Sequence, residues 1–331
     1  MKKISSVIKM NTGENKKMKS ANKQQFTTTF SKPESFKRRV RELKEFIIKS
    51  ILFCCAASSV LITFGVVYTL VSEAWPFFRE ISIYNFLTDK EWTPLFENPQ
   101  YGILTLVSGT LLTTLIALLV AVPLGTITAV FLSEYSSPKA REILKPILEL
   151  LAAVPTVVYG YFALLFVTPL LQKVFSELSS FNALSAGLVM GIMIIPYISS
   201  LSEDAMRAVP LYLREGSLAL GASNLQTSFK VIVPSAFSGI ASAYVLGISR
   251  ALGETMVVAI AAGLQPKLSF NPLESTQTLT AYIVQVSQGD LPQGSIGYRT
   301  IYVAGVVLLL FTFLFNLIGQ RIRTHMEIKY K

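Results

Sequence analysis

Charged side chains are scarce in this chain of 331 residues. Asp, Glu, Lys and Arg make up 15% of it, and hydrophobic residues make up 51%. A typical soluble domain has about 25% charged residues. The charges are also uneven, because residues 1–49 contain 14 of the 30 Lys and Arg but only 4 of the 20 Asp and Glu. The rest of the chain is too apolar for an ordinary soluble fold and indicates a membrane protein, in which the basic head is better explained by topology than by nucleic-acid binding.

Residues that form disulfides, hold metals or bind nucleotide phosphates are nearly absent. The two cysteines, Cys54 and Cys55, are adjacent, and because neighbouring helical residues point to different faces we expect no disulfide. The single histidine, His325, has no partner ligands, so we expect no metal site. The sequence has no Gly-x-x-x-x-Gly-Lys-[Ser/Thr] phosphate-binding loop. We therefore predict that the chain is not an enzyme, needs no cofactor and does not hydrolyse ATP by itself.

Long hydrophobic runs are abundant. A helix needs about 20 residues to cross a hydrocarbon core of about 30 Å. Six runs are long enough, at residues 51–72, 102–132, 146–171, 183–201, 231–264 and 300–319. The sequence therefore predicts an all-α integral membrane protein with a six-helix domain over residues 50–324. Bends or close helix contacts are expected at prolines and small residues within the runs: Pro123, Gly125, Pro155, Gly187, Gly191, Pro196, Gly247 and Gly253.

The two ends of the chain are predicted to lie outside that domain. Residues 1–49 are basic and lack the apolar core of a cleaved signal peptide, so we expect a largely disordered cytoplasmic segment. From Pro33 to Lys49 apolar residues recur at three- and four-residue spacing, as in a helix that lies on the membrane surface. Residues 325–331 are expected to form a short cytoplasmic tail.

Lys and Arg are distributed unequally between the two sets of loops. If the N-terminus is inside the cell, the inner segments contain 24 Lys and Arg and the outer loops contain five. Loops rich in Lys and Arg stay on the cytoplasmic side. The distribution therefore predicts that both termini are cytoplasmic. Trp75 and Trp92 then lie in the first outer loop, in positions suited to an aromatic belt at the membrane interface.

One inner loop, residues 203–230, has a distinctive pattern of small and apolar residues. Leu218 and Leu220 lie on a short predicted helix, and Gly221 follows, so the chain can turn sharply and form a compact projection that fits a groove on a partner. The alternative is an ordinary amphipathic connector. The residues that we assign to this candidate site are Arg214, Glu215, Gly216, Ser217, Leu218, Ala219, Leu220, Gly221, Ala222 and Pro234.

The spacing of this loop resembles the cytoplasmic coupling loop of ABC importer permeases. In that family Glu-Ala-Ala is followed by Gly six residues after the Glu, and the motif ends in Ile-x-Leu-Pro. Glu215, Gly221 and Pro234 occupy the corresponding positions in this chain. Gly216 and Ser217 stand where the family has the two Ala, and Val stands in place of Ile and Leu. The resemblance implies a coupling helix between the fourth and fifth spans that contacts an ATPase.

Further stretches, residues 144–160, 200–210 and 250–256, are similar to the phosphate ABC transporter permeases. Residues 86–94 are similar to the PstC branch rather than to its PstA partner. The resemblance implies a permease of the bacterial inner (plasma) membrane that imports phosphate. Its implied partners are a homologous second permease, two ATPase subunits and an extracytoplasmic phosphate-binding protein. The alternatives are the sister permease, a permease for molybdate or sulfate, an ion-coupled carrier and a membrane-embedded enzyme.

Two charged residues, Arg250 and Glu254, fall inside the fifth predicted span. A charged side chain at the centre of a membrane helix costs about 2.5 to 3.5 kcal/mol and usually faces the interior of the bundle. Residues four apart lie on one face of a helix. One hypothesis places both on the translocation path, where Arg250 binds an oxyanion and Glu254 limits the strength of that binding. The other is a charge pair that fixes this helix to another.

Other polar residues of the spans are expected to have structural roles. Glu203 and Asp204, at the inner end of the fourth span, should face Lys145, Arg207 or a partner subunit and fix the loop rather than carry protons. Tyr159 is expected to pack between helices rather than line a pore, because aromatic residues usually fill helix contacts.

Overall fold

The computed structural model describes residues 35–329, with side chains for residues 41–289 and 291–324. Residues 1–34 of the segment predicted to be largely disordered, and the side chain of His325, lie outside this part. The described residues are helical apart from loops and one isolated antiparallel bridge between Trp92 and Tyr101. The predicted all-α fold is confirmed. The chain divides into two units, Met1–Val66 and Val67–Lys331, which are described separately.

The first unit contains most of helix α2, Ser35–Ala74. The sequence has neither Gly nor Pro from Ser35 to Phe64, so nothing in the backbone interrupts the helix between the charged head and the apolar run. The helix predicted to lie on the membrane surface up to Lys49 is therefore not a separate element. Its described residues, 35–49, form the first turns of α2.

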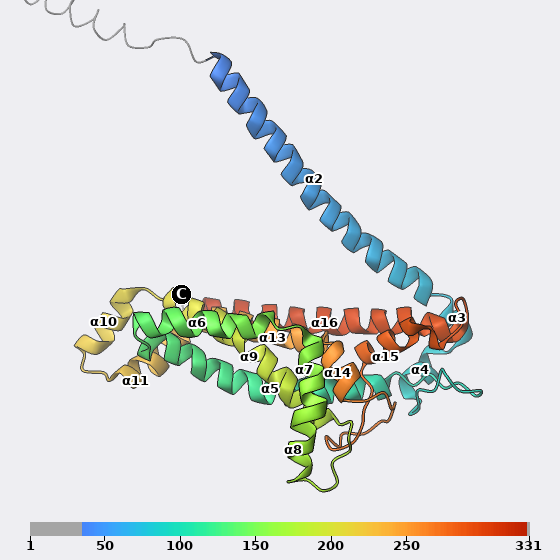
Figure 1. Cartoon of the computed structure of the whole chain (residues 1–331). Coiled ribbons are helices and arrows are strands. Elements are labelled where there is room, and N and C mark those ends of the chain that lie inside the picture. Colours follow the sequence, from blue (N-terminus) through green and yellow to red (C-terminus); the bar gives the residue numbers. More distant parts are fainter. Residues whose placement is uncertain (1–34, 330–331) are drawn as a thin grey trace, which may run out of the picture. The chain divides into compact units, whose positions relative to one another are not determined.

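The bundle of the second unit is built around α5 (Leu104–Val130), α9 (Ala183–Arg207), α13 (Phe237–Leu252) and α16 (Ile296–Lys329). Figure 1 shows them running side by side. A π-helical segment, η1 (Phe131–Tyr135), extends α5. By length and composition, four of the described helices could cross a membrane, or six if each of two bent helix pairs counts as one span.

Helices α5 and α9 approach closely where glycines remove the side chain. A Cβ added at Gly187 would lie 2.7 Å from the side chain of Ile116, and one at Gly191 would lie 2.8 Å from the carbonyl oxygen of Ala117. Backbones can come this near only without a side chain between them. Both glycines were predicted as close-packing points, and this is confirmed.

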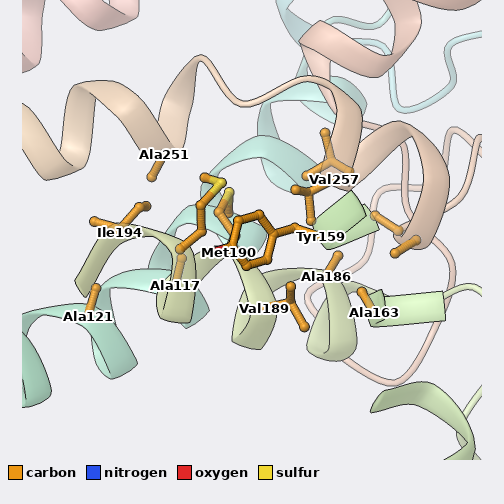
Figure 2. Packing of buried hydrophobic residues seen from close by; sticks show 14 of the residues in the cluster. Ala117, Ala121, Tyr159, Ala163, Ala186, Val189, Met190, Ile194, Ala251 and Val257 are labelled. Carbon is orange, nitrogen blue, oxygen red and sulfur yellow. The ribbon is translucent and has the colours of Figure 1, made fainter. Parts of the chain in front are cut away.

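The core between these helices combines alanines and methionines with β-branched side chains and one tyrosine. Figure 2 shows the ring of Tyr159, from α7 (Thr156–Phe162), next to Met190 of α9, with alanines of α5, α9 and α13 around them. Tyr159 is 8% exposed, and its hydroxyl donates to the carbonyl oxygen of Leu151 at 2.7 Å. The predicted packing role of Tyr159 is confirmed.

The third predicted span, residues 146–171, is not one straight helix. Helix α6 (Pro138–Ala153) starts earlier than predicted, because Ser137 caps it by accepting a backbone hydrogen bond and a proline fits its first position. The chain then bends by 86° into Thr156–Gln172. Pro155 causes the bend, since it cannot donate a helical hydrogen bond and favours an extended conformation in the residue before it. The segment after the bend consists of α7, the π-helical η2 (Ala163–Val167) and α8 (Thr168–Gln172).

The fifth predicted span, residues 231–264, is broken twice. A bend of 72° separates Asn224–Ser235 from α13. Helix α13 then ends at Leu252, and Gly253, a predicted bending point, separates it from α14 (Met256–Ala261). By contrast, α5 and α9 continue through their internal prolines. The pieces before the first bend are α11 (Asn224–Thr227), the π-helical η3 (Ser228–Ile232) and α12 (Val233–Ser235).

The two ends of the second unit differ in chemistry. Helices α10 (Leu211–Ala219) and α11 lie at one end in Figure 1, and α3 and α4 lie at the other, near α15. At the second end Trp92 is 1% exposed and packs edge to face on Tyr282, with ring centroids 5.1 Å apart. The predicted place of Trp92 in an aromatic belt is therefore wrong, because its ring belongs to the core. The elements of this end are α3 (Phe77–Glu80), α4 (Ile83–Thr88), α15 (Leu279–Gln285) and the π-helical η4 (Val286–Asp290).

Candidate functional site

The short helix predicted within residues 203–230 is α10, and it ends in a tight turn. Gly221 follows the helix with a φ of 84°, which is the left-handed conformation. The N–H of Gly221 donates to the carbonyl oxygen of Leu218 at 2.9 Å, and that of Ala222 donates to the carbonyl oxygen of Ser217 at 3.2 Å. A Cβ at Gly221 would meet nothing within 4 Å, so glycine is needed for its φ and not for space. The sharp turn predicted here is confirmed.

The outward face of α10 and its turn is apolar and exposed. Leu220 is 90% exposed and Leu218 is 46% exposed. Glu215 and Gly216 are exposed beside them, and α10 fully buries none of its residues. Pro234 does not belong to this face, since it lies within α12. An exposed apolar projection of this kind is typical of a surface that contacts another protein.

Arg214 and Ser217, assigned from sequence to the same site, attach α10 to the rest of the second unit. Nη2 of Arg214 lies 3.0 Å from Oε1 of Glu134 and donates to the carbonyl oxygen of Met206 at 2.9 Å. The hydroxyl of Ser217 lies 2.9 Å from that of Thr227. Sequence reasoning missed Glu134, because 80 residues separate it from Arg214 and no local pattern joins them.

A buried carboxylate, Glu203, fixes α6 to α9 at the same end. Its side chain is fully buried, and its oxygens lie 2.7 Å from Nε of Arg141 and 2.8 Å from Nζ of Lys145. Lys145 also lies 2.5 Å from Asp204, and Nε of Arg207 lies 3.7 Å from Glu203. A buried carboxylate requires such partners, since its desolvation is costly. The predicted contacts of Glu203 and Asp204 with Lys145 and Arg207 are confirmed, and Arg141 is an additional partner.

Arg250 has no carboxylate partner among the described side chains. It is half-buried on α13, and its guanidinium carbon lies 4.3 Å from the centre of the Tyr197 ring on α9. Its Nε is buried without a hydrogen-bond partner. The aromatic face offsets part of the charge but does not accept the hydrogen bond that the Nε–H group can donate.

Glu254 is not on the helix face of Arg250, which corrects the prediction from their spacing. Helix α13 ends at Leu252, so the four-residue rule no longer applies beyond Gly253. Glu254 is 8% exposed, and its Oε1 accepts the N–H groups of Met256 at 3.1 Å and Val257 at 3.3 Å. The carboxylate thus fixes the first turn of α14 and forms no ion pair with Arg250.

No group of three or more His, Cys, Asp or Glu side chains could hold a metal ion within the described part of the chain. At the end opposite α10, a cavity of about 240 Å³ lies between residues 92–96 and residues 264–266. The residues assigned to the coupling site and to the translocation path do not line it.

Comparison with known proteins relates the whole arrangement to transport systems. Residues 121–330 match the family described as binding-protein-dependent transport system inner membrane component. The chain is 36% identical over 88% of its length to a probable ABC transporter permease protein, YqgH, of Bacillus subtilis, covering 94% of that protein. It is 32% identical over 83% of its length to a phosphate transport system permease protein, PstC, of Xylella fastidiosa, covering 90% of that protein.

A solved structure supports the fold. It is a bacterial ABC transporter involved in the import of the acidic polysaccharide alginate, and the chain matches it with a TM-score of 0.58 at 18% identity. The match covers 85% of this chain and 99% of that one. At this identity the likeness shows the shared fold.

The family match, together with the all-helical fold and its broken spans, defines a membrane-spanning permease subunit of an ABC importer. The chain belongs to the family of binding-protein-dependent transport system inner membrane components. It is a multi-pass protein of the bacterial inner membrane that has no catalytic activity of its own. An ATPase on a separate chain and a substrate-binding protein are its implied partners. Membership excludes the ion-coupled carrier and the membrane-embedded enzyme considered from the sequence.

Proposed function

We propose that this permease imports inorganic phosphate as the PstC-type subunit of its transporter. The assignment of phosphate as the substrate rests on two relatives named PstC. This chain is 32% identical to the Xylella fastidiosa protein over 83% of its length and 32% identical to the Pasteurella multocida protein over 76% of its length. The Bacillus subtilis relative has a more general name and is compatible with this substrate. Phosphate is a tetrahedral oxyanion that guanidinium groups bind well.

The proposed complex contains a homologous second permease, two ATPase subunits and an extracytoplasmic phosphate-binding protein. The support within the chain is the outward face of α10, where Leu218 and Leu220 are exposed and Gly221 closes the helix. A short helix with exposed leucines fits an apolar groove. We assign this face to contact with an ATPase subunit.

We further propose that the α10 end and both termini are cytoplasmic. Arg141, Lys145, Arg207 and Arg214 gather at the α10 end, where the C-terminal part of α16 also lies in Figure 1. Basic residues that flank spans are kept on the cytoplasmic side. An ATPase that binds α10 must also be on this side, because ATP is in the cytoplasm.

Arg250 is proposed to contact phosphate on the translocation path. Its guanidinium is always charged, lacks a carboxylate partner among the described side chains, and keeps Nε unpaired. An anion that passes through an apolar membrane needs such a cation, and the absence of a permanent counter-ion leaves the site open to it. Glu254 contributes by holding α14 next to this position rather than by pairing with Arg250.

Purification in mild detergent tests the proposed complex. The chain is expressed at natural levels together with the proteins encoded next to its gene. The proteins that co-purify with it are identified by mass spectrometry. We expect a second six-span permease and an ATPase in the purified complex. Recovery of the chain as a homodimer with an ATPase, without a second permease, would contradict the proposed PstC-type assembly.

A further inference from the structure

Helix α10 has few apolar contacts that could hold it in place. Among its residues, Leu213 packs partly buried against a cluster that contains Met206 and Ile232, and none is fully buried. A helix of nine residues is too short to be stable by itself. Polar side-chain contacts must therefore determine where α10 sits and what moves with it.

Arg214 joins α10 to two membrane helices at once. Its Nη2 lies 3.0 Å from Oε1 of Glu134 and donates to the carbonyl oxygen of Met206, near the end of α9. The side chains of Arg214 and Glu134 are 21% and 11% exposed. Within the described residues, this is the single salt bridge that involves α10. Arg214 therefore connects α10 to both α5 and α9.

Glu134 is itself held within η1, the π-helical end of α5. The hydroxyl of Ser133 donates to the same Oε1 at 2.6 Å. Another polar contact of α10, from Ser217 to Thr227, ends at the residue before η3. The salt bridge of α10 thus ends in the π-helical segment η1, and its contact through Ser217 ends in α11, directly before η3. In π-helical segments the helix geometry departs from the α form, and such segments are frequent at functional sites.

The same helices lead to the centre of the bundle. Helix α9 contains Met206, which accepts from Arg214, and Tyr197, whose ring faces Arg250. Residues 197 and 206 are separated by nine positions, which correspond to about 13 Å along a helix. A shift of the inner end of α9 therefore acts on the helix segment that contacts Arg250.

We propose that the Arg214–Glu134 pair is the joint through which movement of α10 passes to α5 and α9. The inference rests on the proposed contact of α10 with an ATPase. It assigns Arg214 and Glu134 to positioning, whereas Glu215, Leu218 and Leu220 form the contact face. Without the joint, α10 stays bound to its partner but moves independently of the membrane helices. ATP is then hydrolysed without the corresponding conformational change at the end of the membrane helices opposite α10.

The test uses the complete transporter in lipid nanodiscs, in a background in which Cys54 and Cys55 are replaced by Ser. A cysteine at Gln265, an exposed residue at the end opposite α10, is alkylated by a maleimide with and without ATP. In the otherwise unchanged protein we expect ATP to alter the alkylation rate. Arg214→Gln and Glu134→Gln should reduce this ATP-dependent change about tenfold or more while ATP hydrolysis continues.

Two controls separate this inference from simple misfolding. Lys139→Gln removes an exposed charge from the same end and should change nothing. Arg214→Lys keeps the charge that faces Glu134 and should restore part of the ATP-dependent change. An unchanged effect of ATP on the alkylation rate in both Arg214→Gln and Glu134→Gln would overturn the proposal that this pair is the joint. Loss of ATPase binding in these two variants would also overturn it, because the pair would then merely hold the contact face in shape.

The proposed function has a separate test in the same system. Leu220→Asp places a charge on the exposed contact face and should abolish ATPase binding. If the ATPase still binds with unchanged affinity, the proposed role of α10 fails. Suppose that Leu220→Asp abolishes ATPase binding as expected, while Arg214→Gln and Glu134→Gln respond to ATP like the unchanged protein. This result would contradict the proposed role of the Arg214–Glu134 pair and leave the proposed role of α10 intact.

Discussion

Gly216 and Gly221 are two exposed glycines on one short segment, and they differ in backbone conformation. A Cβ would meet nothing within 4 Å at either residue. Gly216 lies inside α10, whereas Gly221 has a φ of 84°. The same substitution at both positions therefore isolates the effect of the backbone from the effect of added volume.

Gly221→Ala should weaken the contact with the ATPase. A left-handed conformation costs a residue with a Cβ about 1 kcal/mol or more, which corresponds to about a fivefold loss of affinity. Gly216→Ala should not weaken it, since Ala is favoured in a helix by about 1 kcal/mol. Affinity for the purified ATPase, measured by surface plasmon resonance, checks both. Equal effects of the two substitutions would contradict the conformational role of Gly221.

Arg250 and Glu254 give a second prediction at the scale of residues. Because no ion pair joins them, Arg250→Gln combined with Glu254→Gln should not restore what the single substitutions lose. Loss of a charge-assisted contact with an anion should reduce uptake about tenfold or more. Phosphate uptake is measured for the two single variants and the double variant, after assembly of the complex is verified. Recovery of uptake in the double variant would refute contact between Arg250 and phosphate.

At the scale of elements, the amphipathic helix α6 is joined to α9 by ion pairs. None of its residues is fully buried. Arg141 and Lys145 reach the fully buried carboxylate of Glu203 on α9. Replacing that carboxylate removes the partner of Arg141 and one of the two carboxylates that Lys145 contacts.

Glu203→Gln should therefore destabilise the protein by about 2–3 kcal/mol, because the loss of a buried partner leaves charges uncompensated. Glu142→Gln is the matched control, since Glu142 is exposed on α6. Thermal unfolding in detergent should show a clear decrease for the first variant and none for the second. Equal unfolding temperatures for Glu203→Gln and the unchanged protein would show that α6 is held by other contacts.

The elements also show which features sequence patterns could predict. The turn at Gly221 and the bend at Pro155 depend on local backbone chemistry, and both were predicted. The 86° angle of that bend was not, because it depends on how the two pieces pack. The prediction that Arg250 and Glu254 share one helix face was wrong, because α13 ends at Leu252. The Arg214–Glu134 pair depends on the three-dimensional fold, and no local pattern indicates it.

At the scale of the whole molecule, the two ends of the second unit differ in the residues that they contain. The α10 end holds Arg141, Lys145, Arg207 and Arg214. The opposite end holds the aromatic core around Trp92 and the neighbouring cavity. On the positive-inside rule we expect the first end to be cytoplasmic. The proposed topology then has the substrate-binding protein approach the second end.

This topology predicts opposite accessibility for single cysteines at Lys139 and Phe270. Both residues are exposed, and they lie in segments on either side of the predicted spans. In a background without Cys54 and Cys55, a reagent that cannot cross the membrane should label Phe270→Cys in intact cells and Lys139→Cys after the membrane is opened. Labelling of both from outside would contradict the six-span topology.

The central claim is that the chain forms part of an ATP-driven phosphate importer, and uptake of labelled phosphate tests it most directly. The complete complex is reconstituted in proteoliposomes, with its binding protein on the side opposite the ATPase. We predict uptake that requires ATP and the binding protein and that excess unlabelled phosphate abolishes, whereas sulfate and molybdate do not. ATP-dependent uptake of sulfate or molybdate in place of phosphate would contradict the claim.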